Sequence, residues 1–208
     1  MEKQAYVFIT LPDSICLTVC GIIRESANGF LEFMYAKSYI KNSNAIPLDP
    51  IRMPLSDTRI FLGKNNYSEI GAIRDAMPDS WGRFLIEKKV NSSKLSEIDY
   101  MLYSVGERVG ALDFNIDKNP QIVDSYTYVE SLRSLQEAAR NIDIDIDTDS
   151  NSNKFYDILK FGSSMGGARP KAVIESENTL WLAKFNRKND SFNYARLEYA
   201  NMTLARVV

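Results

Sequence analysis

One segment of the sequence combines glycines, hydroxyl side chains and a lysine in a way that suits the binding of phosphate groups. It reads Phe161-Gly-Ser-Ser-Met-Gly-Gly-Ala-Arg-Pro-Lys171. Glycine lets the backbone approach an anion closely, and serine hydroxyl groups add hydrogen-bond donors. The segment therefore predicts a phosphate-binding loop. Its candidate ligands are Ser163, Ser164, Gly166, Gly167 and Lys171.

A second lysine follows this segment in an apolar stretch. Lys184 lies within Leu180-Trp-Leu-Ala-Lys-Phe185, where an unpaired charge costs free energy. Kinases place the lysine that contacts the nucleotide in such a strand and pair it with a helix glutamate. Glu198 lies in the next expected helix, so the sequence predicts an ion pair between Lys184 and Glu198.

Plainer explanations exist for each part taken alone. A loop of glycine and serine is commonly a turn, a strand lysine commonly faces solvent, and a helix glutamate is commonly a solvated side chain. A Walker loop is excluded because the spacing Gly-x-x-x-x-Gly-Lys-[Ser/Thr] is absent. Two apparent strands, Val173-Ile174 and Leu180–Phe185, fit a glycine-rich cover over ATP better. Loop, lysine and glutamate also follow one another in kinase order, which favours the joint interpretation.

The composition removes several classes of chemistry. The 208 residues contain no histidine, which excludes Ser-His-Asp and Cys-His catalysis and histidine-based zinc sites. The net charge is −2 without a cluster of Lys and Arg, so any contact with DNA would need a partner. No apolar stretch is long enough to span a membrane, and Met1-Glu2-Lys3 does not open a signal peptide. We therefore expect no membrane association and a cytoplasmic location.

The elements that must position these residues begin with a β-rich region. Tyr6–Ile9, Ile15–Ile23 and Phe30–Tyr35 are rich in β-branched and aromatic residues, and Pro12-Asp13 and Asn28-Gly29 are turn signals between them. Residues 46–62 predict an irregular connection with one edge strand. Cys16 and Cys20 would lie about 13 Å apart along the second strand, too far for a disulfide.

Helices are expected after this region. Asp79 predicts an N-cap, and Ser96 with Asp99 predicts a capping box. Thr127 with Glu130 predicts a second capping box, and Ser191 a cap for a helix whose apolar stripe includes Tyr194, Leu197, Leu204 and Val208. The pattern indicates an α+β fold with a boundary within residues 115–124.

Several of these blocks resemble the HipA-type serine/threonine kinases of bacterial toxin–antitoxin modules. The segment Ser164–Lys171 is similar to the family's glycine-rich loop. Lys184 and Glu198 fall where the family has its ATP-contacting lysine and its helix glutamate. Ile73–Arg83 and Tyr103–Leu112 are similar to two signature stretches of the family's N-terminal subdomain, and we interpret them as scaffold.

The resemblance implies a division of the chain, a cofactor and partners. Residues 1–120 would form a β-rich HipA-like N-terminal subdomain, and residues 121–208 an incomplete kinase-like N-lobe. ATP with Mg would be the cofactor. A helix-turn-helix antitoxin would be the partner and would provide the only link to DNA. Ser164 aligns with the loop serine that such kinases autophosphorylate, so it is the predicted regulatory phosphosite.

The sequence departs from the family at its carboxyl end. The family's helical C-lobe carries the catalytic base and the aspartate that holds magnesium, whereas no acidic residue follows Glu198 here. We therefore assign no catalytic or metal-binding residue and expect the chain alone to be inactive. It would be a truncated kinase, or its C-lobe would be a separate polypeptide. The alternative is a non-catalytic binding module that regulates or neutralises a partner HipA-type kinase.

Overall fold

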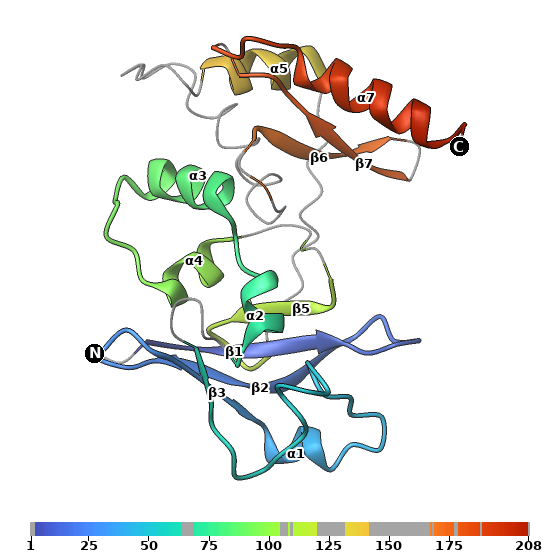
Figure 1. Cartoon of the computed structure of the whole chain (residues 1–208). Coiled ribbons are helices and arrows are strands. Elements are labelled where there is room, and N and C mark those ends of the chain that lie inside the picture. Colours follow the sequence, from blue (N-terminus) through green and yellow to red (C-terminus); the bar gives the residue numbers. More distant parts are fainter. Residues whose placement is uncertain are drawn as a thin grey trace.

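The computed structural model describes most of the chain in separate ranges. These are residues 3–63, 69–104, 108, 110–119, 132–141, 167, 169–176, 179–187 and 189–207. Figure 1 shows an antiparallel sheet near the N-terminus, short helices beside it, and a two-stranded ribbon with two further helices. This mixture confirms the α+β fold class predicted from the sequence.

The larger sheet has five strands in the order β4-β3-β2-β1-β5, and each neighbouring pair is antiparallel. The first three strands correspond to the three stretches predicted from residue type. The chain reverses with φ of 61° at Asp13 and 72° at Gly29, where short polar side chains or glycine tolerate a left-handed backbone. The strands are β1 Lys3–Thr10, β2 Leu17–Glu25, β3 Leu31–Tyr35, β4 Phe61–Gly63 and β5 Leu112–Asn115.

The helices begin where the sequence supplies caps. The Asp79 carboxylate accepts hydrogen bonds from the backbone N–H groups of Trp81 and Gly82 at the start of α3. Ser96 and Asp99 form the predicted capping box of α4. Two very short helices, α1 and α2, were not predicted. The helices around the larger sheet are α1 Lys37–Ile40, α2 Gly71–Asp75, α3 Ser80–Val90 and α4 Glu97–Tyr103.

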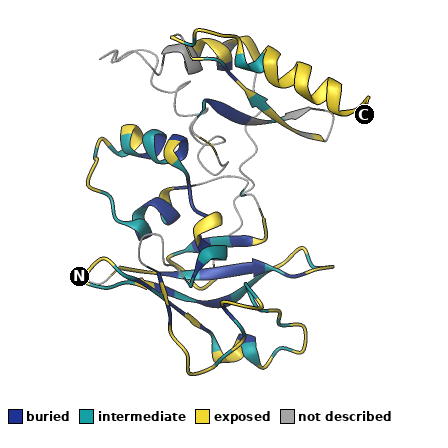
Figure 2. Ribbon diagram, viewed as in Figure 1, coloured by how far each residue is buried: buried dark blue, intermediate teal, exposed yellow. Residues whose placement is uncertain are grey.

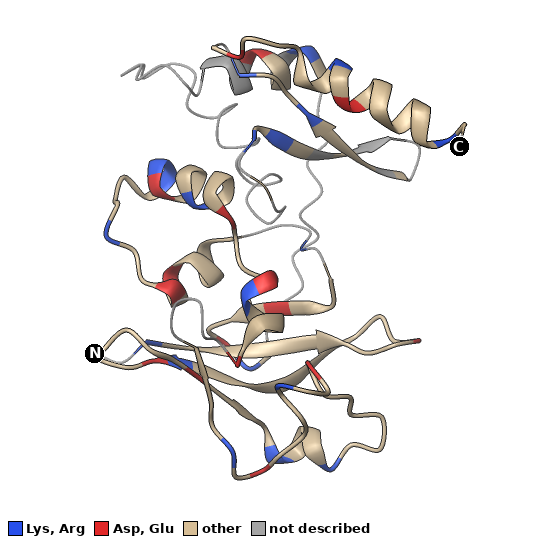
Figure 3. Ribbon diagram, viewed as in Figure 1, with Lys and Arg blue, Asp and Glu red and all other residues tan. Residues whose placement is uncertain are grey.

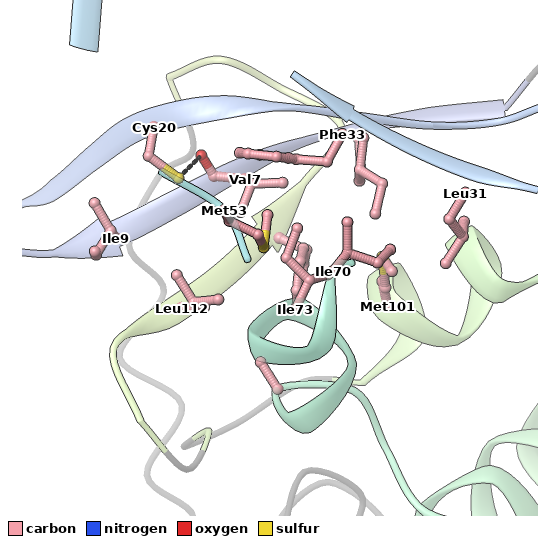
Figure 4. Packing of buried hydrophobic residues seen from close by; sticks show 14 of the residues in the cluster. Val7, Ile9, Cys20, Leu31, Phe33, Met53, Ile70, Ile73, Met101 and Leu112 are labelled. Atoms are coloured by element: carbon pink, nitrogen blue, oxygen red, sulfur yellow. Dashed lines mark hydrogen bonds between the residues drawn. The ribbon is translucent and has the colours of Figure 1, made fainter. Parts of the chain in front are cut away.

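The main core lies between this sheet and the helices α2 and α4. Figure 4 shows Val7 and Phe33 of the sheet meeting Ile73 of α2 and Met101 of α4, all in one buried cluster. Cys20 is also in this cluster, and its thiol donates a hydrogen bond to the carbonyl oxygen of Val7. Burial raises the pKa of Cys20 to about 12, so this thiol is chemically inert.

A smaller unit holds the residues expected to do chemistry. The strands β6 Lys171–Ser176 and β7 Thr179–Lys184 form an antiparallel ribbon. Leu135 of α5, which spans Leu132–Asn141, packs with Ala172 and Phe185 in a second buried cluster. The helix α7, Tyr194–Ala205, follows the ribbon.

Of two predicted helix starts, one is corrected by the structure and the other lies outside the described residues. The N-cap of α7 is Asn193 and not Ser191, because the Asn193 side chain accepts from the backbone N–H of Arg196. No described residue of α7 is buried, and most of this helix is exposed in Figure 2. Leu197 and Leu204 of its apolar stripe are both exposed. The capping box at Thr127 and Glu130 lies outside the described residues.

Gly21 is expected to be intolerant of even one added carbon atom. A Cβ there would lie 2.4 Å from Cε2 of Phe33 and 2.5 Å from the carbonyl oxygen of Met34. Because the second contact is with backbone, Gly21→Ala should lower the free energy of unfolding by about 1–3 kcal/mol. Gly71→Ala is the control, since its Cβ would meet nothing nearer than Arg52 at 3.8 Å. Urea denaturation measures both, and equal effects would contradict the prediction.

Candidate functional site

The β6–β7 ribbon brings two predicted site lysines together. Lys171 and Lys184 are direct cross-strand partners, so their side chains leave the same face of the ribbon. Ala172 and Ala183, the next pair, belong to the opposite face, where they pack with Leu135. Like charges opposite each other destabilise a sheet, so both ammonium groups need compensating partners.

Lys184 has the partner predicted for it. Its Nζ donates a hydrogen bond to the carboxylate of Glu198 in α7 and forms an ion pair with it. The side chains are 43% and 49% exposed, and a pair so open to solvent adds at most about 1 kcal/mol of stability. The pair therefore matters mainly for the direction in which the lysine side chain points.

The connection from β7 to α7 fixes this geometry. The side chain of Asn186 accepts a hydrogen bond from the backbone N–H of Ala195 at 3.2 Å and donates one to Asn193 at 2.8 Å. Asn193 in turn caps α7. One amide network thus sets where α7 starts relative to Lys184, which determines whether Glu198 can reach it.

The end of the glycine-rich segment is tied to the same helix start. The Arg169 guanidinium lies 3.5 Å from the ring centroid of Tyr194, the first residue of α7. It also donates to Asp190 at 2.7 Å, and this hydrogen bond lowers the pKa of the Asp190 carboxyl. Arg169 therefore holds the segment before β6 against the N-terminus of α7, although its role was not predicted from the sequence.

Lys171 makes a contact that the sequence did not predict. Its side chain is 4% exposed, and its Nζ donates to the carbonyl oxygen of Gly167 at 2.7 Å. The Oδ2 atom of Asp79, the N-cap of α3, lies 3.9 Å from the same Nζ. Burial lowers the pKa of Lys171, the Asp79 charge opposes that effect, and the Lys184 charge adds to it.

The described residues thus include four of the seven predicted site residues: Gly167, Lys171, Lys184 and Glu198. Gly167 has φ of 109°, a conformation that favours glycine. Ser163, Ser164 and Gly166 lie outside the described residues. Their part in phosphate binding, and the modification of Ser164, remain predictions.

Comparison with known proteins concerns the sheet and its helices. Residues 16–115 match the family model of the HipA N-terminal domain. These residues form a HipA N-terminal domain. A comparison with curated proteins found no match. The matched range contains both blocks interpreted as scaffold, Ile73–Arg83 and Tyr103–Leu112, and Asp79 within the first. The glycine-rich segment, Lys184 and Glu198 lie beyond it.

Arginines of the two blocks, Ile73–Arg83 and Tyr103–Leu112, connect elements of the fold, in keeping with the interpretation of these blocks as scaffold. Arg83 binds Glu97 with two hydrogen bonds of 2.7 and 2.6 Å and joins α3 to α4. The Arg108 side chain is 5% exposed, and it donates to the carbonyl oxygens of Met101 and Ser104 and to the Asp113 carboxylate. The buried arginine was missed because an isolated arginine in a sequence is normally exposed.

Beyond these contacts, the described residues were compared for clusters of charge, for metal-binding groups and for membrane-spanning helices. Figure 3 shows Lys and Arg interspersed with Asp and Glu along the helices and strands. In the described ranges no group of three or more His, Cys, Asp or Glu could hold a metal ion. No described helix is long and apolar enough to cross a membrane.

Proposed function

We propose that this chain is the ATP-loop and regulatory portion of a HipA-like serine/threonine kinase, a toxin component restrained by a helix-turn-helix antitoxin. The observation that carries the proposal is the Lys184–Glu198 ion pair, placed beside Lys171 on one face of the ribbon and downstream of a HipA N-terminal domain. A strand lysine paired with a helix glutamate is how kinases hold the α- and β-phosphates of ATP.

The residues fit ATP phosphates better than they fit magnesium. Lys184 offers an ammonium group on a side chain that is 43% exposed, and Gly167 keeps the backbone before β6 bare of a side chain. ATP, when bound, would bring the phosphoryl group and its magnesium. Lys184 would bind the phosphates, Glu198 would orient Lys184, and the segment around Gly166 and Gly167 would cover them. We assign no described residue to the metal.

Binding of ATP and transfer of its phosphate are separate steps in this proposal. Sequence 1–208 has no acidic residue after Glu198, so the base that orients the substrate hydroxyl would come from a C-lobe outside these residues. We propose a cytoplasmic location, where ATP and reduced thiols such as Cys16 and Cys20 coexist. Contact with DNA would run through the antitoxin, because Lys and Arg are interspersed with Asp and Glu along the described helices and strands in Figure 3.

A second candidate is a non-catalytic module that binds and neutralises a partner HipA-type kinase. The observation that favours it is that the family match covers the HipA N-terminal domain and no kinase element. Under this alternative, the sheet and its helices would be the working part. The ribbon lysines would then be structural.

The experiment that separates the candidates is a phosphotransfer assay on purified residues 1–208. With labelled ATP and a general protein substrate, we expect no phosphoprotein from these residues alone, because we assign no catalytic base and no metal ligand to them. Addition of a purified C-lobe polypeptide should restore transfer, and mass spectrometry should locate phosphate on Ser164. Turnover by residues 1–208 alone, or loss of a partner kinase's activity on mixing, would contradict the first proposal.

A further inference from the structure

We propose that Asp79 is a positioning residue for the glycine-rich segment, which it reaches through Lys171. The HipA N-terminal domain would then set the geometry of a phosphate-binding site that lies outside it. This inference rests on the proposed ATP-binding function for its consequence, although the contact itself does not depend on ATP.

The two carboxylate oxygens of Asp79 have different environments. Oδ1 accepts the backbone N–H groups of Trp81 and Gly82 at 3.1 and 3.2 Å, as an N-cap does. Oδ2 is buried and has no hydrogen-bond partner among the described residues. A buried carboxylate oxygen without a partner is costly, so a cation held nearby explains why the chain tolerates it here.

Lys171 provides that cation from the other side of the contact. Its Nζ lies 3.9 Å from Oδ2 of Asp79 and 2.7 Å from the carbonyl oxygen of Gly167. The amine therefore lies between α3 and the backbone before β6, where a small movement would convert the ion pair into a charge-assisted hydrogen bond. Because the amine contacts both groups, a shift in the start of α3 would be transmitted through Lys171 to the Gly167 carbonyl.

Gly167 is shaped to this contact. A Cβ there would lie 2.9 Å from Nζ of Lys171 and 3.8 Å from Oδ2 of Asp79. A side chain at this position would therefore push the Lys171 amine from its present place, whereas the distance to Asp79 is an ordinary contact. Gly167 also has a φ of 109°, a backbone conformation that glycine adopts without strain and other residues rarely do.

The charges around Lys171 explain why the Asp79 carboxylate matters. Lys184 of β7 is its direct cross-strand partner and also carries a positive charge. Asp79 at the start of α3 supplies the opposing negative charge. Without it, the two lysines would repel each other with less compensation, and Lys171 would withdraw from Gly167 or lose its proton.

The test uses Asp79→Asn, because asparagine caps a helix about as well as aspartate does but removes the charge on Oδ2. We expect the pKa of Lys171, already lowered by burial, to fall further, because the Asp79 charge favours the protonated amine. NMR titration of isotope-labelled lysine side chains measures this. Amide hydrogen exchange in β6 should become faster, whereas α3 should keep its protection.

ATP affinity gives the functional readout. Isothermal titration calorimetry should show roughly fivefold weaker ATP binding for Asp79→Asn. In a Lys171→Gln background, Asp79→Asn should have no further effect on exchange in β6 or on ATP affinity, because the partner is already absent. Asp79→Ala should also destabilise α3, since it loses the cap.

The outcomes separate this inference from the function it extends. An unchanged Lys171 titration and unchanged β6 exchange in Asp79→Asn would overturn the contact, whatever ATP does. If the Lys171 titration and the β6 exchange both change but ATP affinity stays the same, the contact only stabilises the fold, and the positioning role is wrong. If the unmodified protein binds no ATP, the proposed function fails, and the titration and exchange still decide whether Asp79 holds Lys171.

Discussion

The Arg108→Met variant should lose roughly 3 kcal/mol of unfolding free energy, because the apolar stem of the side chain is kept but its guanidinium group is lost. The Arg108 side chain is 5% exposed and donates to the carbonyl oxygens of Met101 and Ser104. Each buried carbonyl that loses this charged donor costs about 1–3 kcal/mol. Methionine replaces the apolar stem of arginine but cannot donate a hydrogen bond. Thermal and urea denaturation of the purified variant would measure the loss.

Arg83→Met is the matched control for that experiment. Arg83 also pairs with a carboxylate and lies over an aromatic ring, 4.4 Å from the centroid of Tyr100. Its side chain is 30% exposed and Glu97 is 37% exposed, so its loss should cost about 1 kcal/mol or less. Equal losses for the two variants would mean that burial of Arg108 does not set its contribution.

Replacing Lys184 with methionine should weaken ATP binding by about tenfold to a hundredfold. A hydrogen bond between an ammonium and a phosphate is charge-assisted and contributes about 1.5–3 kcal/mol, which converts to that range of affinity. Glu198→Gln should weaken binding less, because it releases the lysine without removing its charge. Calorimetry with ATP measures both variants.

The control lysine for this experiment lies far along the chain from the ribbon. Lys41 is exposed and ends α1, so Lys41→Met removes one positive charge without touching the site. Its ATP affinity should match that of the unmodified protein. A Lys184→Met variant that binds ATP equally well would show that Lys184 simply faces solvent, the plainer explanation of a strand lysine.

The sequence predicted the features that depend on neighbouring residues. The strands β1 to β3, the Asp79 cap and the capping box of Ser96 and Asp99 all follow from residues a few positions apart. The Lys184–Glu198 pair could also be predicted, because its two residues lie in consecutive elements. Local pattern and short connections carry this information.

Features that join distant segments were missed. Nothing in the sequence shows that Asp79 and Lys171 meet, or that Arg108 is buried among backbone carbonyls. The cap of α7 was misplaced by two residues because serine and asparagine both cap well, and the hydrogen bond that the Asn193 side chain accepts from the backbone N–H of Arg196 decides between them. Tertiary contacts made these choices, and local preference alone could not.

The position of β1 within its sheet has a consequence for synthesis of the protein. It lies between β2, which follows directly, and β5, whose Phe114 pairs with Val7. During translation β1 and β2 can form a hairpin early, but one edge of β1 must wait, unpaired, until the ribosome has released Phe114. A waiting strand edge of this kind pairs readily with other chains. Slow translation between β2 and β5 would therefore favour aggregation of nascent chains over completion of the sheet.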